Sequence, residues 1–262
     1  MARRGFGTAE RQGLIMRLTV IGCSDAFGSG ARFNTCFMVQ GGERTILLDC
    51  GASTPVALKV RGVDFNSIDG IVLTHLHGDH FGAIPFFMLE SQFHLRRERP
   101  LTVVGPPGTR NRVIAAMEVF FPESSKTEWR FPFTIGEIAP GVPEEVLGFA
   151  VRTTEVIHQS GAPSTAVRLT GGGKSLAYSG DTEWTDALYP IADGADLFIM
   201  ECYDYDRSMP GHTSFATLKE KRPMLRAKRI MITHMNPTML ARQDEARSAG
   251  LIVAEDGLAI DV

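Results

Sequence analysis

Three of the seven histidines in this chain lie within six residues of one another, beside an aspartate. The apolar run 71–74 predicts a strand that leads directly into this cluster. Residues two apart in an extended segment point to the same side, so His75 and His77 can bind one cation together. A glycine then permits a sharp turn, after which Asp79 and His80 can face back toward a second cation. Imidazole and carboxylate suit zinc, with manganese or iron as alternatives, so the cluster predicts a metal site.

Three further polar residues each follow a run that predicts a strand: His158, Asp181 and His234. Taken singly, a residue of this kind is more often a hydrogen-bonded loop residue than a ligand. Strand ends can meet at one edge of a fold, however, and the first cluster is too small to fill two metal shells. Together with that cluster, the three residues predict the missing ligands.

The order of these residues resembles the pattern of the metallo-β-lactamase superfamily: His-x-His-x-Asp-His, then His, Gly-Asp-Thr and Thr-His. The resemblance extends over nearly the whole chain from Met16 onward and includes the segment Leu-Leu-Asp49-Cys-Gly51. It implies an α+β fold, the αββα sandwich of two mixed sheets flanked by helices, and two divalent metal ions. The implied ligands are His75, His77 and His158 for one ion, Asp79, His80 and His234 for the other, and Asp181 as the bridge.

Two positions distinguish the branches of this superfamily. His77 stands where the diiron flavoprotein branch has glutamate, and Asp181 stands where the true β-lactamases have cysteine. Two later segments, one around Glu201 and one around His212, resemble paired motifs of ribonuclease Z-like enzymes, in which a glutamate orients a histidine beside the metals. The resemblance therefore favours a ribonuclease Z-like hydrolase.

The implied catalytic residues are Asp79, Glu201 and His212. A departing alkoxide needs a proton, and His212 is the candidate acid, with Glu201 stabilising its charged form. Asp79 would help to orient a metal-bridging hydroxide that attacks phosphorus. The alternative for His212 is that it only caps a helix beginning near Ser214. Arg32, in the glycine-rich segment 28–34, could contact phosphate or form a surface salt bridge.

The interval between His158 and Asp181 bears on the substrate. It predicts a simple hairpin with a triple-glycine turn, without room for the long basic arm of ribonuclease Z enzymes that mature tRNA. The formal net charge of −3 also gives no general field for nucleic acid. A small or short phosphodiester, including a cyclic one, is therefore expected rather than a large nucleic acid. Left open are a tRNA 3′-processing endonuclease, a thioesterase, lactonase or arylsulfatase on the same site, and a catalytically silent carrier or binding protein.

The pattern of elements predicts one layered α+β domain over residues 16–262, preceded by an N-terminal extension at 1–15. No apolar run is long enough for a membrane span, and four scattered cysteines indicate a reduced, cytoplasmic protein. The resemblance leaves a homodimer open. Strands are expected at 17–21, 35–39, 44–49, 71–74, 101–104, 151–157, 175–178, 197–200 and 229–233, and helices at 53–61, 80–93, 109–120, 214–221 and 237–248.

Overall fold

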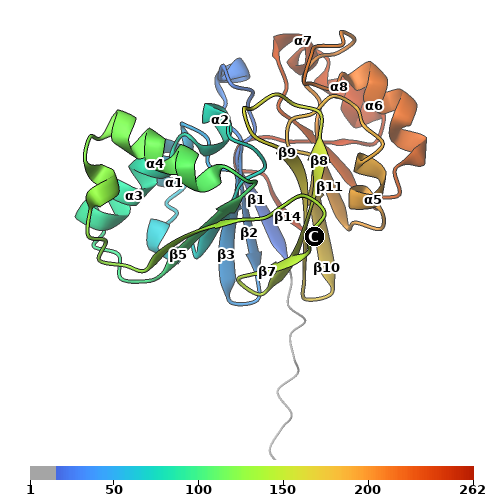
Figure 1. Cartoon of the computed structure of the whole chain (residues 1–262). Helices are drawn as coiled ribbons and strands as arrows, with labels where there is room; N and C mark the ends of the chain where they lie inside the picture. The colour runs from blue at the N-terminus through green and yellow to red at the C-terminus, as the bar shows by residue number, and fades with distance from the viewer. Residues whose placement is uncertain (1–15) are drawn as a thin grey trace, which may run out of the picture.

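The computed structural model describes residues 16–262, so the predicted extension at 1–15 lies outside the described residues. Two seven-stranded mixed sheets pack face to face, and helices cover the outer face of each sheet (Figure 1). The predicted αββα sandwich is therefore confirmed. The assignment of 16–262 to one domain stays a prediction. No helix in the described part of the chain is long and apolar enough to cross a membrane.

The first sheet is built from the N-terminal half of the chain and the last strand. Its strands, in spatial order, are β14 (Ala259–Asp261), β1 (Arg17–Gly22), β2 (Cys36–Gly41), β3 (Arg44–Leu48), β4 (Gly70–Val72), β5 (Leu101–Gly105) and β6 (Phe133–Glu137). The first four are antiparallel neighbours, and β3 to β6 run parallel. The helices of this half are α1 (Thr54–Val60), α2 (Gly78–Phe81), α3 (Ile84–Leu89) and α4 (Thr109–Phe120).

The second sheet comes from the C-terminal half. Its strands, in spatial order, are β13 (Ile252–Val253), β12 (Ile230–Thr233), β11 (Leu197–Glu201), β10 (Lys174–Tyr178), β9 (Ser164–Gly171), β8 (Phe149–Val156) and β7 (Glu144–Val146). The strands from β10 to β13 are parallel, and the others are antiparallel. The helices here are α5 (Leu188–Ala192), α6 (Phe215–Lys221), α7 (Pro237–Leu240) and α8 (Gln243–Ser248).

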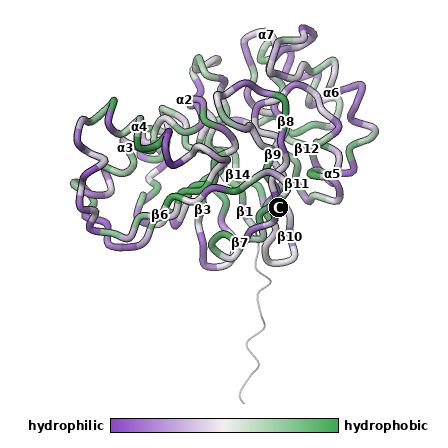
Figure 2. Tube along the Cα trace, in the orientation of Figure 1, coloured by the Kyte–Doolittle hydropathy of each residue, from purple (hydrophilic) through white to green (hydrophobic). Residues whose placement is uncertain are grey.

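The main core lies between the two sheets. Phe37 of β2 meets Tyr178 of β10 edge to face at 5.2 Å between ring centroids, and both side chains are fully buried. Figure 2 shows the hydrophobic residues concentrated along the strands in the middle of the molecule. Alternating residues of the strands point to opposite faces of each sheet. One set packs in the core between the sheets, and the other packs beneath the helices. The rigid sandwich fixes the strand ends, and these carry the polar residues described next.

Each predicted strand overlaps an observed one, whereas two predicted helices are interrupted. The helix expected at 80–93 is divided into α2, α3 and a π-helical turn at Glu90–His94. Pro85 causes the first break, because proline lacks a backbone N–H and suits only the first turn of a new helix. Further short turns of 3-10 helix lie at Ser29–Ala31, Phe65–Ser67, Ser124–Lys126 and Arg222–Met224.

Candidate metal centre and catalytic site

All seven predicted ligand residues meet at one end of the sandwich. Most of them lie shortly after the end of a strand, where the chain turns toward the helices, whereas Asp79 and His80 lie in α2. The contributing segments follow β4, β8, β10 and β12, so the site joins both sheets. Residues more than 150 positions apart in the sequence, such as His80 and His234, are neighbours here.

The first group contains three histidines. The ligand atoms of His75, His77 and His158 all lie within 4.8 Å of one another. His158 Nε2 is 3.0 Å from His77 Nδ1, so the two rings present different nitrogens to a shared point. A triangle of imidazole nitrogens of this size is the donor set that zinc binds well.

The second group combines carboxylates with imidazoles, namely Asp79, His80, Asp181 and His234. His80 Nε2 lies 3.2 Å from Asp79 Oδ2 and also 3.2 Å from Asp181 Oδ2. His234 Nε2 is again 3.2 Å from Asp181 Oδ2. The same oxygen is 3.8 Å from His75 Nε2 and 3.9 Å from His158 Nε2, in the first group. Asp181 thus stands between the two groups, as a bridging ligand would.

Two observations indicate that cations fit this arrangement. His75 Nε2, His80 Nε2 and Asp181 Oδ1 are buried and have no hydrogen-bond partner among the described residues. Asp79 and Asp181 form no ion pair with Lys or Arg anywhere in the described chain, although both carboxylates are largely withdrawn from water. Buried charge without compensation is costly, and two divalent cations would supply that compensation while using the free nitrogens.

A second set of residues orients the histidine rings. Asp49 Oδ2 is 2.7 Å from His80 Nδ1, and Thr74 Oγ1 is 3.0 Å from His75 Nδ1. Thr35 Oγ1 is 3.3 Å from His234 Nδ1, and Gly211 O is 2.8 Å from His158 Nδ1. With Nδ1 held from outside, each ring turns Nε2 toward the centre of the site. None of these outer partners was predicted from the sequence, although Asp49 at the end of an apolar strand carried a signal.

The backbone at the site is strained at two positions. Asp49 and His234 both have positive φ, 59° and 61°, which residues with a Cβ rarely adopt. Such strain persists only where the surroundings hold the residue in place, and it is concentrated at functional sites. Gly51 is confined for another reason, because a Cβ there would lie 2.1 Å from the carbonyl oxygen of Asp79.

His212 lies beside both groups and is paired with Glu201. Its Nδ1 is 3.2 Å from Glu201 Oε1, and the buried carboxylate also accepts a hydrogen bond from Thr182 N at 2.6 Å. Burial raises the pKa of Glu201 to about 7. Burial lowers the pKa of His212, but the hydrogen bond and charge of Glu201 outweigh it and raise this pKa to about 9. The cap of α6 is Ser214, which accepts from Thr217 N, so His212 is not used as a cap.

Arg32 has no carboxylate as its partner in the described structure. Its guanidinium donates to Ala254 O at 3.0 Å and to Gln243 Oε1 at 3.4 Å. It forms no ion pair within residues 16–262. Arg32 therefore links its loop to the C-terminal segments rather than forming a surface salt bridge.

A small cavity opens beside His212. Its volume is about 310 Å³, near the lower end for ligand pockets. The lining residues are His77, Ile157, His158, Gln159, Glu183, Pro210, Gly211 and His212. The predicted hairpin between His158 and Asp181 is present as β9 and β10. The two strands pair as far as Gly171 and Lys174, and only a short glycine turn links them. The structure thus offers a compact opening with no arm emerging from this hairpin.

The sandwich and the cluster at its edge are those of a metallo-β-lactamase-fold hydrolase of the ribonuclease Z-like branch. The chain belongs to the family described as anti-Pycsar protein Apyc1, which matches residues 16–256. The chain is 24% identical over 251 residues to a ribonuclease Z of Mycobacterium sp. (strain KMS), and the match covers 91% of this chain and 83% of that one.

Two further proteins resemble it. The probable metallo-hydrolase YhfI of Bacillus subtilis is 28% identical over 230 residues, covering 84% of this chain and 87% of YhfI. The crystal structure of YhfI superposes with a TM-score of 0.73 at 23% identity, covering 95% of this chain and all (100%) of that one. A diphosphatase from the PhnP family gives a TM-score of 0.77 at 20% identity, covering 94% of this chain and 98% of that one. The last likeness bears on the fold alone.

Proposed function

We propose that the protein is a phosphodiesterase dependent on two divalent metal ions, zinc by preference because the donor set is rich in imidazole. The observation that carries the proposal is the His212–Glu201 pair, with Nδ1 and Oε1 3.2 Å apart, beside both ligand groups. The proposed ligands are His75, His77 and His158 for one ion, Asp79, His80 and His234 for the other, and Asp181 as the bridge.

The pair favours a phosphodiester over other esters because of the leaving group. Breaking the P–O bond of a dialkyl phosphate releases an alkoxide, which leaves slowly unless a proton arrives. A thiolate from a thioester leaves without that help. An acid next to the metals therefore contributes most to phosphodiester cleavage, by roughly 10²–10⁴-fold.

The chain's own residues perform the proton transfers. When bound, the cations would supply Lewis acidity at phosphate and make water nucleophilic near neutral pH. Asp79, 11% exposed in its side chain, accepts a hydrogen bond from the attacking water and orients it, and this water gives up one proton to solvent before it attacks as hydroxide. His212, protonated at Nε2, gives that proton to the leaving oxygen as the P–O bond breaks and the bond from the water oxygen to phosphorus forms. Glu201 holds Nδ1 meanwhile, and His212 regains its proton from solvent.

We further propose that the substrate is a small phosphodiester, including cyclic ones. The cavity of about 310 Å³ is small for an oligonucleotide. The β9–β10 hairpin provides no arm for a folded RNA, and the net charge of −3 gives no general attraction for one. A small diester needs neither feature, because the two cations would attract its single negative charge locally.

A substrate panel on protein of known metal content tests this function. Its members are bis-p-nitrophenyl phosphate, a dialkyl or cyclic phosphodiester, a thioester, a lactone, an aryl sulfate and a precursor tRNA. We expect the small phosphodiesters to give the highest kcat/KM. A thioester or lactone turning over faster than every diester would overturn the proposal, and preference for precursor tRNA would restore the endonuclease alternative.

Metal analysis separates an enzyme from a carrier of the same fold. Protein purified without chelators should contain close to two ions per chain, since both ligand groups are complete. If it holds none, and added zinc does not bind, the silent carrier or binding protein becomes the better explanation.

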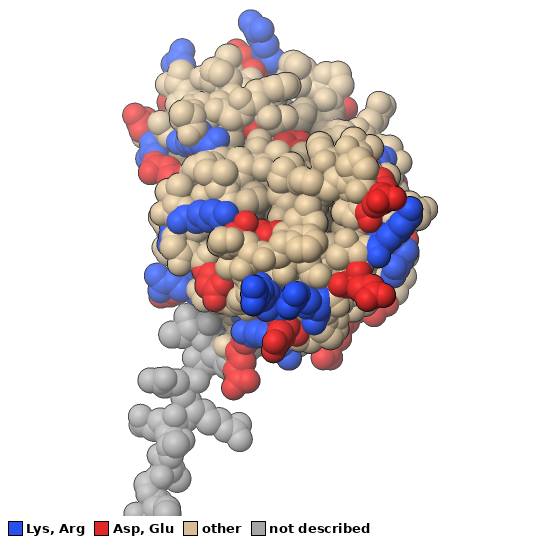
Figure 3. Space-filling model, turned by 90° about the vertical axis from the view of Figure 1, so that its left-hand side faces the viewer, with Lys and Arg blue, Asp and Glu red and all other residues tan. Residues whose placement is uncertain are grey.

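We also propose that two copies of this chain pair through the face formed by α3 and α4. Phe86 of α3 and Phe120 of α4 are exposed by 43% and 50% and lie 5.5 Å apart between ring centroids, and Phe93, in the turn that follows α3, is exposed by 67%. The middle of this side of the molecule carries few charged side chains (Figure 3). An exposed apolar surface of this kind marks an interaction site. Light scattering should give a dimer for the wild type and a monomer for Phe120→Asp. A monomeric wild type would remove the proposal.

A further inference from the structure

The proposed acid and one proposed metal ligand are carried by two loops that a single carboxylate joins. His212 lies in the loop 202–214, between β11 and α6, and His234 lies at the end of β12. Asp204 belongs to the first loop and is 96% buried, since only 4% of it is exposed. Its carboxylate is directed at the segment that follows His234.

Both oxygens of Asp204 are used. Oδ2 accepts from Asn236 Nδ2 at 2.7 Å and from Thr238 Oγ1 at 2.8 Å, across to the second loop. Oδ1 accepts from the backbone N–H groups of Asp206 and Arg207, at 3.2 and 3.0 Å, within its own loop. Burial raises the pKa of Asp204, but these hydrogen bonds outweigh it and bring the pKa to about 2. The group is therefore an anion held between two loops.

Backbone hydrogen bonds also join the loop after β11 to β12 and the segment that follows it. Cys202 N donates to Thr233 O at 2.9 Å, and Asn236 N donates to Tyr203 O at 2.8 Å. Asn236 is also the N-cap of α7, where its side chain accepts from Met239 N. The side-chain oxygen of Asn236 thus caps the start of α7, while its side-chain nitrogen donates a hydrogen bond to Asp204.

These contacts between the two segments determine how the aromatic rings of the site lie against one another. The ring of Tyr203, next to Asp204, stacks on His212 with centroids 4.6 Å apart. His212 lies nearly parallel to His234, at 14° and 5.5 Å. Because His234 has a positive φ of 61°, its backbone needs outside support. A shift of one loop relative to the other would move the acid relative to the ligand.

We propose that Asp204 is a positioning residue, which fixes His212 relative to His234 by tying the loop after β11 to the segment after β12. The proposal rests on the proposed function, in which His212 donates the proton. Asp204 forms no ion pair among the described residues and belongs to none of the ligand groups. Its contribution is therefore geometric, and misplacement of a catalytic group by about 1 Å can cost 10²-fold in rate.

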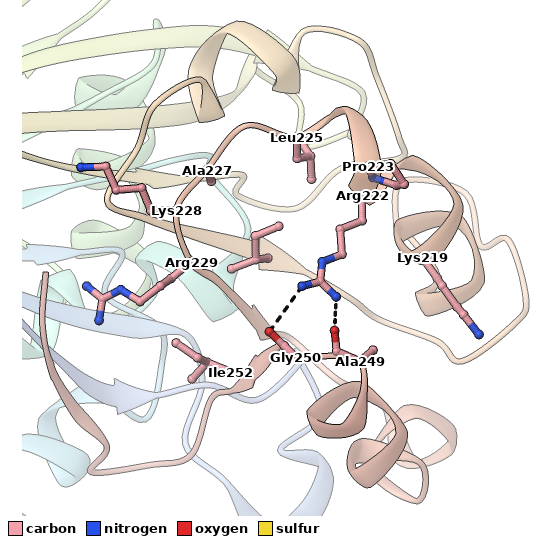
Figure 4. A pocket seen from close by; sticks show the side chains of 11 residues that line it. Lys219, Arg222, Pro223, Leu225, Ala227, Lys228, Arg229, Ala249, Gly250 and Ile252 are labelled. Atoms are coloured by element: carbon pink, nitrogen blue, oxygen red, sulfur yellow. Dashed lines mark hydrogen bonds between the residues drawn. The ribbon is translucent and has the colours of Figure 1, made fainter.

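A matched control exists elsewhere in the same half of the chain. Arg222 reaches across a pocket of about 720 Å³ and donates to the carbonyl oxygens of Ala249 and Gly250, after the end of α8 (Figure 4). It too joins two segments through side-chain hydrogen bonds, but it contacts no residue of the site. Arg222→Met should lower the melting temperature and leave the catalytic parameters unchanged.

The test compares Asp204→Asn with the double variant Asp204→Asn/Asn236→Asp. The single change leaves one acceptor oxygen where Asp204 uses two, so the new amide nitrogen faces donors on one side, either the backbone N–H groups of its own loop or Asn236 and Thr238. In the double variant the amide at 204 can keep its oxygen toward the backbone N–H groups and donate from its nitrogen to the carboxylate at 236. Aspartate at 236 also remains a good helix cap. We expect Asp204→Asn to lower kcat about 10- to 100-fold on a dialkyl or cyclic diester, and less than about 3-fold on bis-p-nitrophenyl phosphate, whose leaving group needs no acid. The double variant should recover most of this loss.

Equal loss on both substrates, or loss of bound metal, would show a merely structural role and overturn the proposal. Failure of the double variant to recover would also count against it when its melting temperature is that of the wild type. If the wild type cleaves no phosphodiester, the proposed function fails by itself. The positioning role is then decided by the imidazole ¹⁵N spectrum, in which Asp204→Asn should shift the His212 signals and Arg222→Met should not. Unchanged His212 signals would end the proposal.

Discussion

His80 Nδ1 lies 2.7 Å from Asp49 Oδ2, and both side chains are completely buried. Asp49 also accepts hydrogen bonds from Thr74 N and Thr74 Oγ1, at 2.8 and 2.9 Å. The carboxylate is therefore fixed by the strand that leads into the metal cluster before it contacts the ring. This arrangement turns His80 Nε2 inward and makes it more basic, as an outer carboxylate does for a zinc-bound histidine.

Asp49→Asn should accordingly weaken metal binding by about 10- to 100-fold, because the amide cannot hold the ring with the same charge. Competition with a coloured zinc chelator measures the change. Asp69→Asn is the matched control: Asp69 is also a buried aspartate and pairs with Arg44 and Arg99, away from the site. Equal metal affinity in the two variants would remove Asp49 from the list of supporting residues.

The sequence was enough to predict the inner residues of the site. His75, His77 and His80 are close in sequence and follow an apolar strand, so the extended segment and the turn into α2 together bring them to one place. His158 and Asp181 could be expected at the same edge because each follows a strand. The outer residues could not be found in this way. Thr35 reaches His234 from 199 positions away, and the partner of His158 is a backbone carbonyl, for which no residue type gives a signal.

The fold shows the same limit. The long, strongly apolar strands were predictable, whereas β7, β13 and β14 have only two or three residues and lie at or near the edges of the sheets. Short edge strands depend on their neighbours rather than on their own pattern. Asp204 is a further example, because an aspartate in a polar loop looks like a solvated residue until the second loop is seen against it.

His212→Ala should lose turnover and keep both metal ions. The loss should be about 10²–10⁴-fold on a diester with an alkoxide leaving group and much smaller on bis-p-nitrophenyl phosphate. Steady-state kinetics and metal analysis on the same preparation test both parts. His94→Ala serves as the control, since His94 is an exposed histidine at the end of a helical turn. A variant that loses metal instead would identify His212 as a ligand.

Gly211→Ala should disturb the site through His158. A Cβ at this position would lie 2.7 Å from His158 Nδ1, and Gly211 has a φ of +81°. Gly173→Ala provides the control, because Gly173 has a φ of +76° with open space around it. Both changes should cost about 1–2 kcal/mol of backbone strain. Only Gly211→Ala should also lower the number of bound ions, measured by mass spectrometry under native conditions. The same metal content in both variants would contradict this view of His158.

Removal of the metals should destabilise the protein. Without cations, Asp79 and Asp181 are buried charges that histidines alone must compensate, because neither carboxylate pairs with Lys or Arg among the described residues. An ion present at 100 times its dissociation constant contributes about 2.7 kcal/mol, so a chelator should lower the melting temperature by at least about 5 °C. The same chelator saturated with zinc beforehand is the control. An unchanged melting temperature would argue that the site holds no ion.

The ionised form of Asp204 should make stability depend on acid. Its pKa is about 2, below the ordinary value of 3.8, because the hydrogen bonds from Asn236 and the loop stabilise the anion. A lowered pKa contributes stability that is present above the unfolded value and is lost as the pH falls through the folded value. The difference in unfolding free energy between wild type and Asp204→Asn should therefore be constant above about pH 5 and shrink between pH 4 and 3. Urea unfolding measures it, with Asp206→Asn, an exposed aspartate of the same loop, as the control for a lost charge. A difference that stays constant down to pH 3 would mean that the carboxylate of Asp204 is not held as an anion by these bonds.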